Sequence, residues 1–486
     1  MNTALNTPVV KMPRAFGWKD IAGYFFGDFG CNMSFSLISS YMFLFFTQYI
    51  GIRLEHYALI ILISKIWDGI NDPIIGAMVD RFTPKSGDKF RPWIFWGAWP
   101  LAIAGAVMFL DTAAWPYWGK LTLMIVGYFV WDIAYTVVNV PYGSMNSVIT
   151  ADPVQRSQLS TFRSFGAIIA GVPLGILIPF FAYKQQAVDG AQKSIFQGQA
   201  MLPIALVLGL VALASFMILW AWSVERIQHS ETGSQKFNYF KTIKSFFTSR
   251  PILGFVLGQV SYIIFIMSSG QLNQMTFQLY FGNGQLNSLV ILTYLIPMVG
   301  GAFLVKPLVK RFGKKNLVAW PTLGSVVVYA LMWLLPISSP YVWIGLMVLA
   351  ATCSVGQMLV GWAMVSDLID YSEYRTGQRE EGSIYATYSM VRKLGQGIGQ
   401  AMVPAFIALL IPGLVMNDAS TWSMDYATSI KNMTAIFPLI GSVITFLAYQ
   451  FIYNLDTQKL AEIERALGRT SQEVDTSIEA ITRKED

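Results

Sequence analysis

Apolar runs of about 20 residues, the length that crosses the hydrocarbon core of a bilayer as an α-helix, recur along nearly the whole chain. Such runs can place every backbone polar group in a helical hydrogen bond, so we take lipid as the solvent for most of the chain. We predict twelve spans, six in each half. They are Tyr24–Tyr49, Ala58–Val79, Trp93–Leu110, Leu121–Val148, Phe162–Phe181, Met201–Trp220, Ile252–Tyr280, Ser288–Val305, Leu317–Leu335, Val342–Val365, Ile384–Leu410 and Ala435–Phe451.

The composition indicates an all-α membrane protein. Hydrophobic residues make up 54% of the 486 residues and charged residues only 13%, which is far from the balance of soluble domains. Several runs contain glycine or proline, which packed membrane helices tolerate, and the alternating pattern of membrane β-strands is absent. The first run lacks a small-residue cleavage site and is too long for a signal peptide, so we expect it to be retained.

Lysine and arginine gather in alternate loops, so the net charge of +6 does not require a nucleic-acid partner. The opposite loops hold little more than Arg53, Lys120, Lys184 and Lys193. By the positive-inside rule we expect a multi-pass protein of the cytoplasmic (cell) membrane with both termini in the cytoplasm.

The longest charged interruption divides the chain into two nearly equal halves. Each half also carries a basic turn after a glycine-headed helix end, at Gly76–Arg91 and at Gly301–Asn316, which is a weak internal repeat. Two six-helix bundles that rock about a central site form the major facilitator fold, which we predict for this chain. The predicted units are a first bundle at 1–223, a cytoplasmic linker at 224–250, a second bundle at 251–455 and a tail with a solvated helix at 456–486.

The second predicted span carries two carboxylates, although an ionisable group inside a membrane is costly unless it faces a cavity or a partner. Asp68 and Asp72 are four residues apart and share one helical face, with Asn71 beside them. Their mutual repulsion would be relieved by a bound cation such as Na⁺ or by a retained proton, so we interpret them as a cation-coupling site. The alternative is a structural pair neutralised by Lys65 or an arginine, which we disfavour because Lys65 is expected nearer the lipid interface.

The fourth predicted span places Asp132, Thr136 and Asn139 along one stripe of a helix. Hydroxyl and amide oxygens at this spacing suit either a cation shell shared with the two aspartates of the second span or a sugar hydroxyl. Hydrogen bonding between helices is the competing explanation, above all for Thr136.

A candidate substrate site combines the first and fifth spans. Asp28 and Asn32 stand one turn apart, and Arg163 lies among aromatic residues of the fifth span. A carboxylate and an arginine flanked by aromatic rings are typical of a sugar site, with charge-assisted hydrogen bonds at the ring edge and stacking on its face. A structural pair of Asp28 with Arg163 is the alternative.

In the second half, Lys393 stands deep in an otherwise apolar run. We expect it either to meet an anionic substrate or to pair with an aspartate of the first half, unless it extends to the lipid interface. Gln271 is one of several amides of the seventh span and joins the candidate substrate site. We also predict a gating network of ion pairs at the cytoplasmic mouth, formed by Asp80, Arg81, Asp367, Asp370 and Arg379.

Other chemistries lack their motifs in this sequence. No phosphate-binding GxxxxGK[ST] loop is present, so ATP is not the expected energy source, and we expect no enzyme activity. The glycine run Gly395–Gln400 lies within a predicted span and is interpreted as packing surface. Cys31 and Cys353 fall inside apolar runs, which favours buried thiols. We expect no structural metal and no cofactor beyond a coupling cation, H⁺ or Na⁺.

The chain resembles the glycoside–pentoside–hexuronide:cation symporter family over essentially its whole length. The resemblance rests on WDGINDPIIG and YTVVNVPYGS in the first half, and on DLIDYSEY with the following EGSIYATYSMVRK in the second. It implies a coupling-cation role for Asp68, Asp72, Asn71 and Thr136. It further implies that Arg163 is a sugar-site arginine and that Lys393 matches the lysine of the family's eleventh helix.

The chain departs from the melibiose branch of that family at two positions. Where that branch has aspartates, this chain has Asn32 and Asn139, which looks more like the pentoside, xyloside and glucuronide transporters. Fewer carboxylates should weaken Na⁺ binding, since the affinity for a hard cation follows ligand charge. We therefore expect import of a pentoside-type disaccharide such as a xyloside, or of a glucuronide, by symport with H⁺.

Two other transport functions compete with this expectation, namely a Na⁺-coupled sugar symporter and a lysolipid carrier of the same fold. The polar glutamines of the seventh span argue against the lipid carrier. The expected partners are a glycoside, H⁺ or Na⁺ and the lipid bilayer, without nucleic acid, and we expect a monomer.

Overall fold

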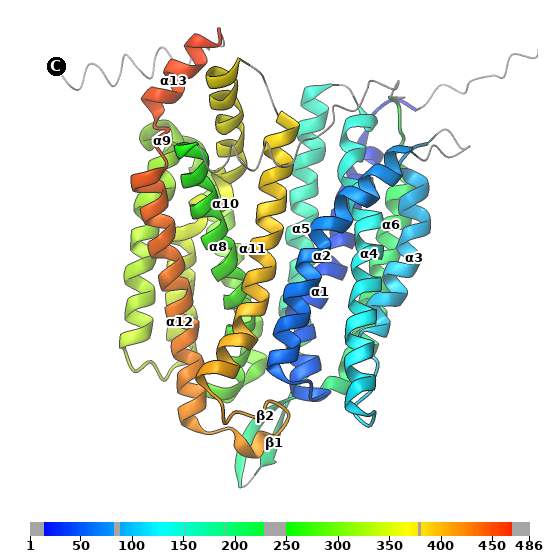
Figure 1. Cartoon of the computed structure of the whole chain (residues 1–486), viewed down its shortest axis with the longest axis vertical. Helices are drawn as coiled ribbons and strands as arrows, with labels where there is room; N and C mark the ends of the chain where they lie inside the picture. Colours follow the sequence, from blue (N-terminus) through cyan, green and yellow to red (C-terminus); the bar gives the residue numbers. More distant parts are fainter. Residues whose placement is uncertain are drawn as a thin grey trace, which may run out of the picture.

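The computed structural model describes residues 14–81, 88–150, 152–188, 190–227, 249–377 and 381–468. Two groups of helices stand side by side, α1 to α6 in one and α8 to α13 in the other (Figure 1). The first group comprises α1 (Trp18–Leu44), α2 (Leu54–Arg81), α3 (Arg91–Val107), α4 (Tyr117–Ile149), α5 (Pro153–Ala182) and α6 (Met201–Trp222). The second comprises α8 (Arg250–Met275), α9 (Leu292–Leu334), α10 (Pro340–Thr376), α11 (Glu381–Leu410), α12 (Met424–Leu447) and the short α13 (Thr457–Ala466).

Short helical turns of other types extend three of these helices. The π-helical turns Phe45–Tyr49, Thr276–Tyr280 and Ala448–Ile452 follow α1, α8 and α12, and a 3₁₀ segment, Gly284–Ile291, precedes α9. Most of the predicted linker, at 228–248, lies outside the described residues, so the predicted unit boundaries stay predictions.

The predicted spans are helical, but their number is not confirmed. Eight helical stretches of the described chain are long and apolar enough to cross a membrane, and one of them, Gly284–Leu334, contains two predicted spans. Helices α2, α3 and α11 are not among the eight. The reason is that α3 has only 17 residues, while α2 and α11 carry charged side chains in their interiors.

A sharp kink at Gly313 divides α9 into the helical parts 292–312 and 314–334. Gly313 has φ +76° and ψ 162°, a conformation that is essentially restricted to glycine. A Cβ atom at this position would also clash with Oγ1 of Thr457, the first residue of α13. The second of the two predicted basic turns therefore depends on this glycine.

A small β-hairpin between α5 and α6 is an addition that the prediction of an all-α fold did not include. Strands β1 (Tyr183–Val188) and β2 (Ala191–Phe196) pair antiparallel, and Gly190 has φ +79° at the turn. The sequence Asp-Gly before β2 is a typical two-residue hairpin signal, which the predicted succession of helices did not take into account. The end of the molecule that carries this hairpin is called the hairpin end below (Figure 1).

The hairpin joins the two helix groups. Lys193 donates a hydrogen bond to the carbonyl oxygen of Ala419 at 2.7 Å, and Gln185 donates one to that of Gly282 at 2.7 Å. The hydroxyl of Ser194 accepts a hydrogen bond from the backbone N–H of Gly284 at 3.0 Å. These contacts close the hairpin end between the first and the second group.

Helix α13 is not the fully solvated helix that the sequence predicted. Its Ala461 and Ile463 side chains are buried, and Ile463 joins a core cluster with residues of α9 and α10. Asp456 caps the helix by accepting a hydrogen bond from the N–H of Lys459 at 2.8 Å. The spacing of apolar residues in this charged segment thus produces a docked amphipathic helix.

The kink predicts a position-specific sensitivity in α9. Gly313→Ala should lower the free energy of unfolding by about 1–3 kcal/mol, because alanine at this φ and ψ is strained. Thermal unfolding of the purified protein in detergent measures the change. Gly300→Ala is the matched control, since a Cβ at that helical position meets nothing within 4 Å. Equal stability of the two variants would contradict the kinked conformation.

Candidate functional site

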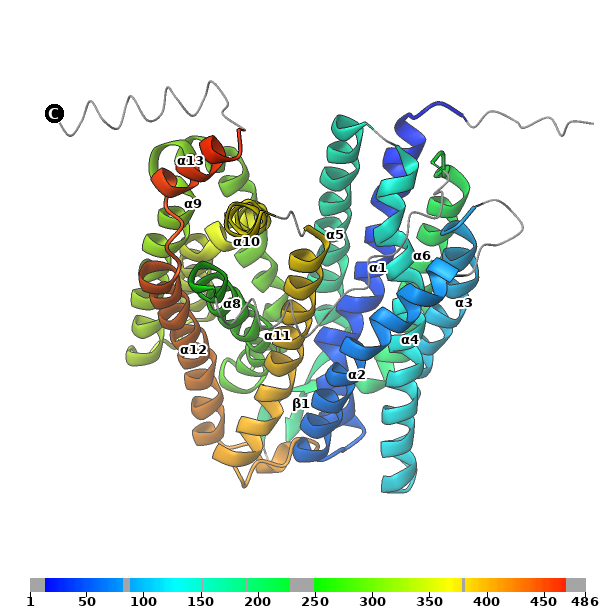
Figure 2. The same cartoon turned by 45° about the horizontal axis from the view of Figure 1, so that its top comes forward.

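The two helix groups meet along α2 and α11, which lie side by side at the centre of the molecule (Figure 2). Lys393 of α11 reaches across this seam to both aspartates of α2. Its ammonium forms an ion pair with Asp72 and lies 3.4 Å from Oδ1 of Asp68. Of the three arrangements considered for this lysine, the structure shows the pair with an aspartate of the first half.

Lys65 is a second cation at the same place, which corrects the prediction that it lies near the lipid interface. It is only 6% exposed, and its Nζ lies 3.5 Å from Oδ2 of Asp68. Its ammonium also lies 5.7 Å from the centre of the Tyr128 ring of α4, a favourable cation–π distance. The spacing of three residues between Lys65 and Asp68 was the signal in the sequence that could have identified this contact.

Helix α4 adds a third carboxylate, Asp132, which the sequence placed on the polar stripe of the fourth span without assigning it a cation-coupling role. Asp132 is buried, interacts electrostatically with Asp68 and Lys65, and has an oxygen that accepts no hydrogen bond from the described residues. We call Asp68, Asp72, Asp132, Lys65 and Lys393 the carboxylate cluster. With all five groups ionised, three negative charges face two positive ones, which leaves an excess of one negative charge.

The other predicted cation-coupling residues differ in how they relate to this cluster. Thr136 donates a hydrogen bond to Oδ1 of Asp72 at 3.2 Å. Asn71 is buried, and its amide nitrogen donates no hydrogen bond within the described part of the chain. Asn139 is half-buried and forms no hydrogen bond with Asp68 or Asp72.

Asp28 and Arg163 form the pair that was considered as the alternative to a sugar contact. Nε of Arg163 donates to Oδ1 of Asp28 at 3.0 Å, and Asn32 donates to Oδ2 of the same carboxylate at 2.9 Å. The guanidinium also stacks on the ring of Tyr142 at 5.2 Å. The side chain of Arg163 is nevertheless 39% exposed, so it can still meet a ligand.

Arg392 is a further cation that sequence reasoning missed, although it directly precedes Lys393. It lies within electrostatic range of Asp28, and its Nε donates no hydrogen bond to any described residue. Asp28 is therefore under the electrostatic influence of two arginines, Arg163, which it contacts, and Arg392, which acts more weakly.

The predicted substrate residues do not all come together. Gln271 lines a cavity of about 480 Å³, whereas Asp28, Asn32, Arg163, Asn139 and Lys393 are not among the residues that line it. The cavity lies between α1 and α5 of the first group and α8, α9 and α10 of the second. Its uncharged lining separates it from both ionic regions.

The hairpin end is closed by a pair of amides. The side chains of Gln48 and Gln278 donate to each other at 2.9 and 2.8 Å, and Gln278 also donates to the carbonyl oxygen of Ser194 at 3.1 Å. Gln278 lies in the seventh predicted span, and no signal in the sequence indicated a role for it. Its partner across the halves could not be read from spacing.

The predicted gating residues lie toward the opposite end. Asp367 accepts a hydrogen bond from Lys314 of its own helix group at 2.6 Å, Asp370 is half-buried, and Arg81 is exposed. The side chain of Asp80 and all of Arg379 lie outside the described residues. The gating role of this set stays a prediction.

Comparisons with known proteins agree with the resemblance seen in the sequence. The chain is 30% identical over 485 residues to the "Uncharacterized symporter YjmB" of Bacillus subtilis (strain 168), which covers 97% of this chain and 100% of that relative. It is 27% identical to the "Glucuronide carrier protein homolog" of Escherichia coli (strain K12), with 93% and 96% covered. It is also 27% identical to the "Isoprimeverose transporter" of Lactiplantibacillus pentosus, with 92% and 91% covered.

The fold is shared with solved transporters. A bacterial homolog of the human lysosomal transporter Spinster, in an inward-facing and occupied conformation, matches with a TM-score of 0.59 at 13% identity, over 88% of this chain and 95% of that one. The predicted major facilitator fold is confirmed in its helical architecture. Because the profile described as "MFS/sugar transport protein" matches residues 23–457, the chain belongs to this family of membrane transporters and is not an enzyme.

Proposed function

We propose that the protein imports a glycoside by symport with a proton. The observation that carries this proposal is the carboxylate cluster, because it joins the two halves inside the membrane and has one more acid than base. A buried excess charge is costly, and a single bound proton removes it. A proton site that also holds the halves together is suited to coupling ion movement to a change of conformation.

Proton binding would act on the seam between α2 and α11. A protonated Asp72 attracts Lys393 less, so the seam loosens, and loss of the proton restores the ion pair. A Na⁺ ion would need the space between Asp68 and Asp72 that the ammonium of Lys393 fills in this structure. This competition favours H⁺ over Na⁺ as the coupling ion.

The substrate class follows from the relatives and from the region around Asp28. The named relatives include a glucuronide carrier homolog and an isoprimeverose transporter, so we propose a xyloside-type disaccharide or a glucuronide. Arg163, with Asp28 and Asn32 beside it, offers charge-assisted hydrogen bonds to ring hydroxyls. The positive charge of Arg392 would also suit a carboxylate.

The membrane arrangement is part of the proposal. We propose twelve spans in the cell membrane, with both termini and the basic loops in the cytoplasm and the hairpin end outside. Support comes from large apolar side chains that stay exposed on the helices, such as Phe303, Leu334 and Leu409, because lipid would cover them.

Transport by proteoliposomes tests the role of the two aspartates. Addition of the glycoside should drive proton uptake with the sugar, and uptake should fall as the external pH rises at constant membrane potential. Asp68→Asn and Asp72→Asn should abolish accumulation but retain sugar exchange, because a neutral amide cannot release a proton. Asp425→Asn, which changes an exposed carboxylate at the start of α12, is the control. Uptake driven by Na⁺ at fixed pH would contradict proton coupling.

The ion pair across the seam predicts non-additive stability. Lys393→Met and Asp72→Leu should each lower the free energy of unfolding by about 2 kcal/mol, since each leaves a charge without its partner. The double variant should lose less than the sum, which thermal unfolding in detergent would show as a coupling of about 1–2 kcal/mol. Lys184→Met, at an exposed position of β1, controls for the loss of a lysine. Strictly additive losses would show that the pair does not form.

A further inference from the structure

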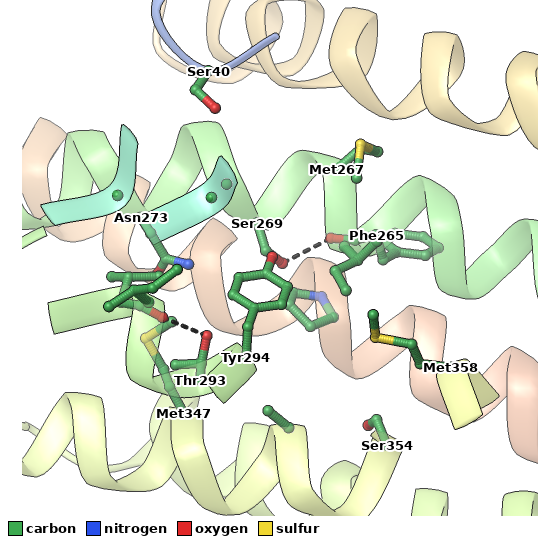
Figure 3. A pocket seen from close by; sticks show the side chains of 18 of the residues that line it. Ser40, Phe265, Met267, Ser269, Asn273, Thr293, Tyr294, Met347, Ser354 and Met358 are labelled. Atoms are coloured by element: carbon green, nitrogen blue, oxygen red, sulfur yellow. Dashed lines mark hydrogen bonds between the residues drawn. The ribbon is translucent and has the colours of Figure 1, made fainter. Parts of the chain in front are cut away.

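The cavity of about 480 Å³ combines an uncharged wall with aromatic and polar side chains. Figure 3 shows part of its lining, including Asn273, Thr293, Tyr294 and Ser354 from different elements. None of the described residues that line it carries a charge. Its volume falls in the range of about 300–1,000 Å³ that is usual for small-molecule sites.

Four buried amides face this cavity without satisfying their hydrogen-bonding capacity. Gln271, Asn273, Gln274 and Asn287 all line it and are exposed by only 3%, 3%, 4% and 9%. The side-chain oxygen of each accepts no hydrogen bond from the described part of the chain. Because buried polar groups in proteins are nearly always paired, four such amides around one cavity need a common explanation.

Two amides close to these four do have hydrogen-bond partners. Gln259 on the same helix, α8, accepts a hydrogen bond from Gln357 at 2.6 Å, and Gln278 pairs with Gln48. Two hydroxyls of the cavity wall also have local partners, as Ser269 donates to the carbonyl oxygen of Phe265 and Thr293 to that of Val290, each at 2.7 Å. The four amide oxygens of the described cavity wall therefore keep hydrogen-bonding capacity that a guest molecule can use.

The chemistry of such a guest follows from the wall. Amide groups both donate and accept, which matches hydroxyls, and aromatic side chains such as Tyr294 offer apolar faces. A charged guest would find no counter-ion among the described lining residues, and burial of an unpaired charge is costly. We propose that this cavity is a second saccharide subsite that takes an uncharged, hydroxyl-bearing sugar unit, an inference that rests on the proposed glycoside transport.

Two helices of the first group connect this subsite to the Asp28 region. Asn32 stands one turn before Ser36 of the cavity wall on α1, and Arg163 stands one turn before Ala167 of the wall on α5. One turn of four residues spans about 6 Å, a distance that the two units of one disaccharide can bridge. The terminal sugar would then contact Asn32 and Arg163 while the second unit enters the cavity.

Calorimetric binding to the purified full-length protein tests the subsite with three probes. They are isoprimeverose, methyl α-xyloside as its terminal unit alone, and the aldonic acid of isoprimeverose, which carries a carboxylate on the second unit. Isoprimeverose should bind at least about tenfold more tightly than either of the other two. Gln274→Leu should weaken its binding about tenfold, the scale of one or two lost hydrogen bonds, and change methyl α-xyloside binding less than twofold.

Two further variants separate the subsite from general damage. Ala351→Leu narrows the cavity and should weaken isoprimeverose binding selectively, whereas Asn432→Leu, an amide of α12 outside the cavity wall, should leave all affinities unchanged.

Equal loss of disaccharide and monosaccharide binding in Gln274→Leu overturns the subsite. So does unchanged affinity with higher thermal stability, which would mean that the amides hold water only. Equal binding of the aldonic acid overturns the requirement for an uncharged unit. If the wild type binds none of the three probes, the proposed xyloside substrate fails and the subsite with it, whereas glycoside import is tested separately by the proteoliposome experiment.

Discussion

The ion pairs of Lys393 with Asp68 and Asp72 are the contact on which the central part of the structure depends. They connect α11 to α2 through side chains that are buried or half-buried, where an unpaired charge on either side would be costly. The helices approach closely because residue 397 is glycine, since a Cβ there would lie 2.2 Å from Cγ of Lys65. The close approach of α2 and α11 thus depends on the same residues that form the charged contact: Gly397 leaves room for Lys65, and Lys65 and Lys393 share Asp68.

The seam at the hairpin end is built from neutral groups. The amides of Gln48 and Gln278 are hydrogen-bonded to each other. Replacing each of these hydrogen bonds by one to water costs only about 1 kcal/mol. Separating the charged side chains of α2 and α11 costs more free energy, unless one of the carboxylates is neutralised first. Under the proposed function, the hairpin end would therefore open at little cost, whereas the central seam would separate only on protonation.

The sequence predicts the parts of the site that lie on one helix better than those that lie between helices. Asp68 with Asp72, and Asp28 with Asn32, follow from a spacing of four residues on a helical face. Helical spacing also places Lys65 near Asp68, and Asp132 near Thr136. Spacing does not show, however, which face of a helix meets lipid and which meets another helix. The separation of Gln271 from Arg163, and the pairing of Gln278 with Gln48, depend on how the two halves pack. The Asp-Gly sequence before β2 is a hairpin signal, but it lies between two long apolar runs, and the prediction considered only the helices that those runs indicate.

The order of two residues on α11 suggests how ion and substrate are coupled. Lys393 contacts the carboxylate cluster, while Arg392, the preceding residue, lies within electrostatic range of Asp28. Lys393 is attracted to Asp72 and Arg392 to Asp28, so the helix that carries both cations is attracted to both regions. Because an α-helix moves as a rigid element, a displacement of α11 that follows protonation of Asp72 would carry Arg392 along relative to Asp28 and Arg163. Under the proposed function, protonation therefore changes the substrate region through the displacement of one helix, without direct contact between proton and sugar.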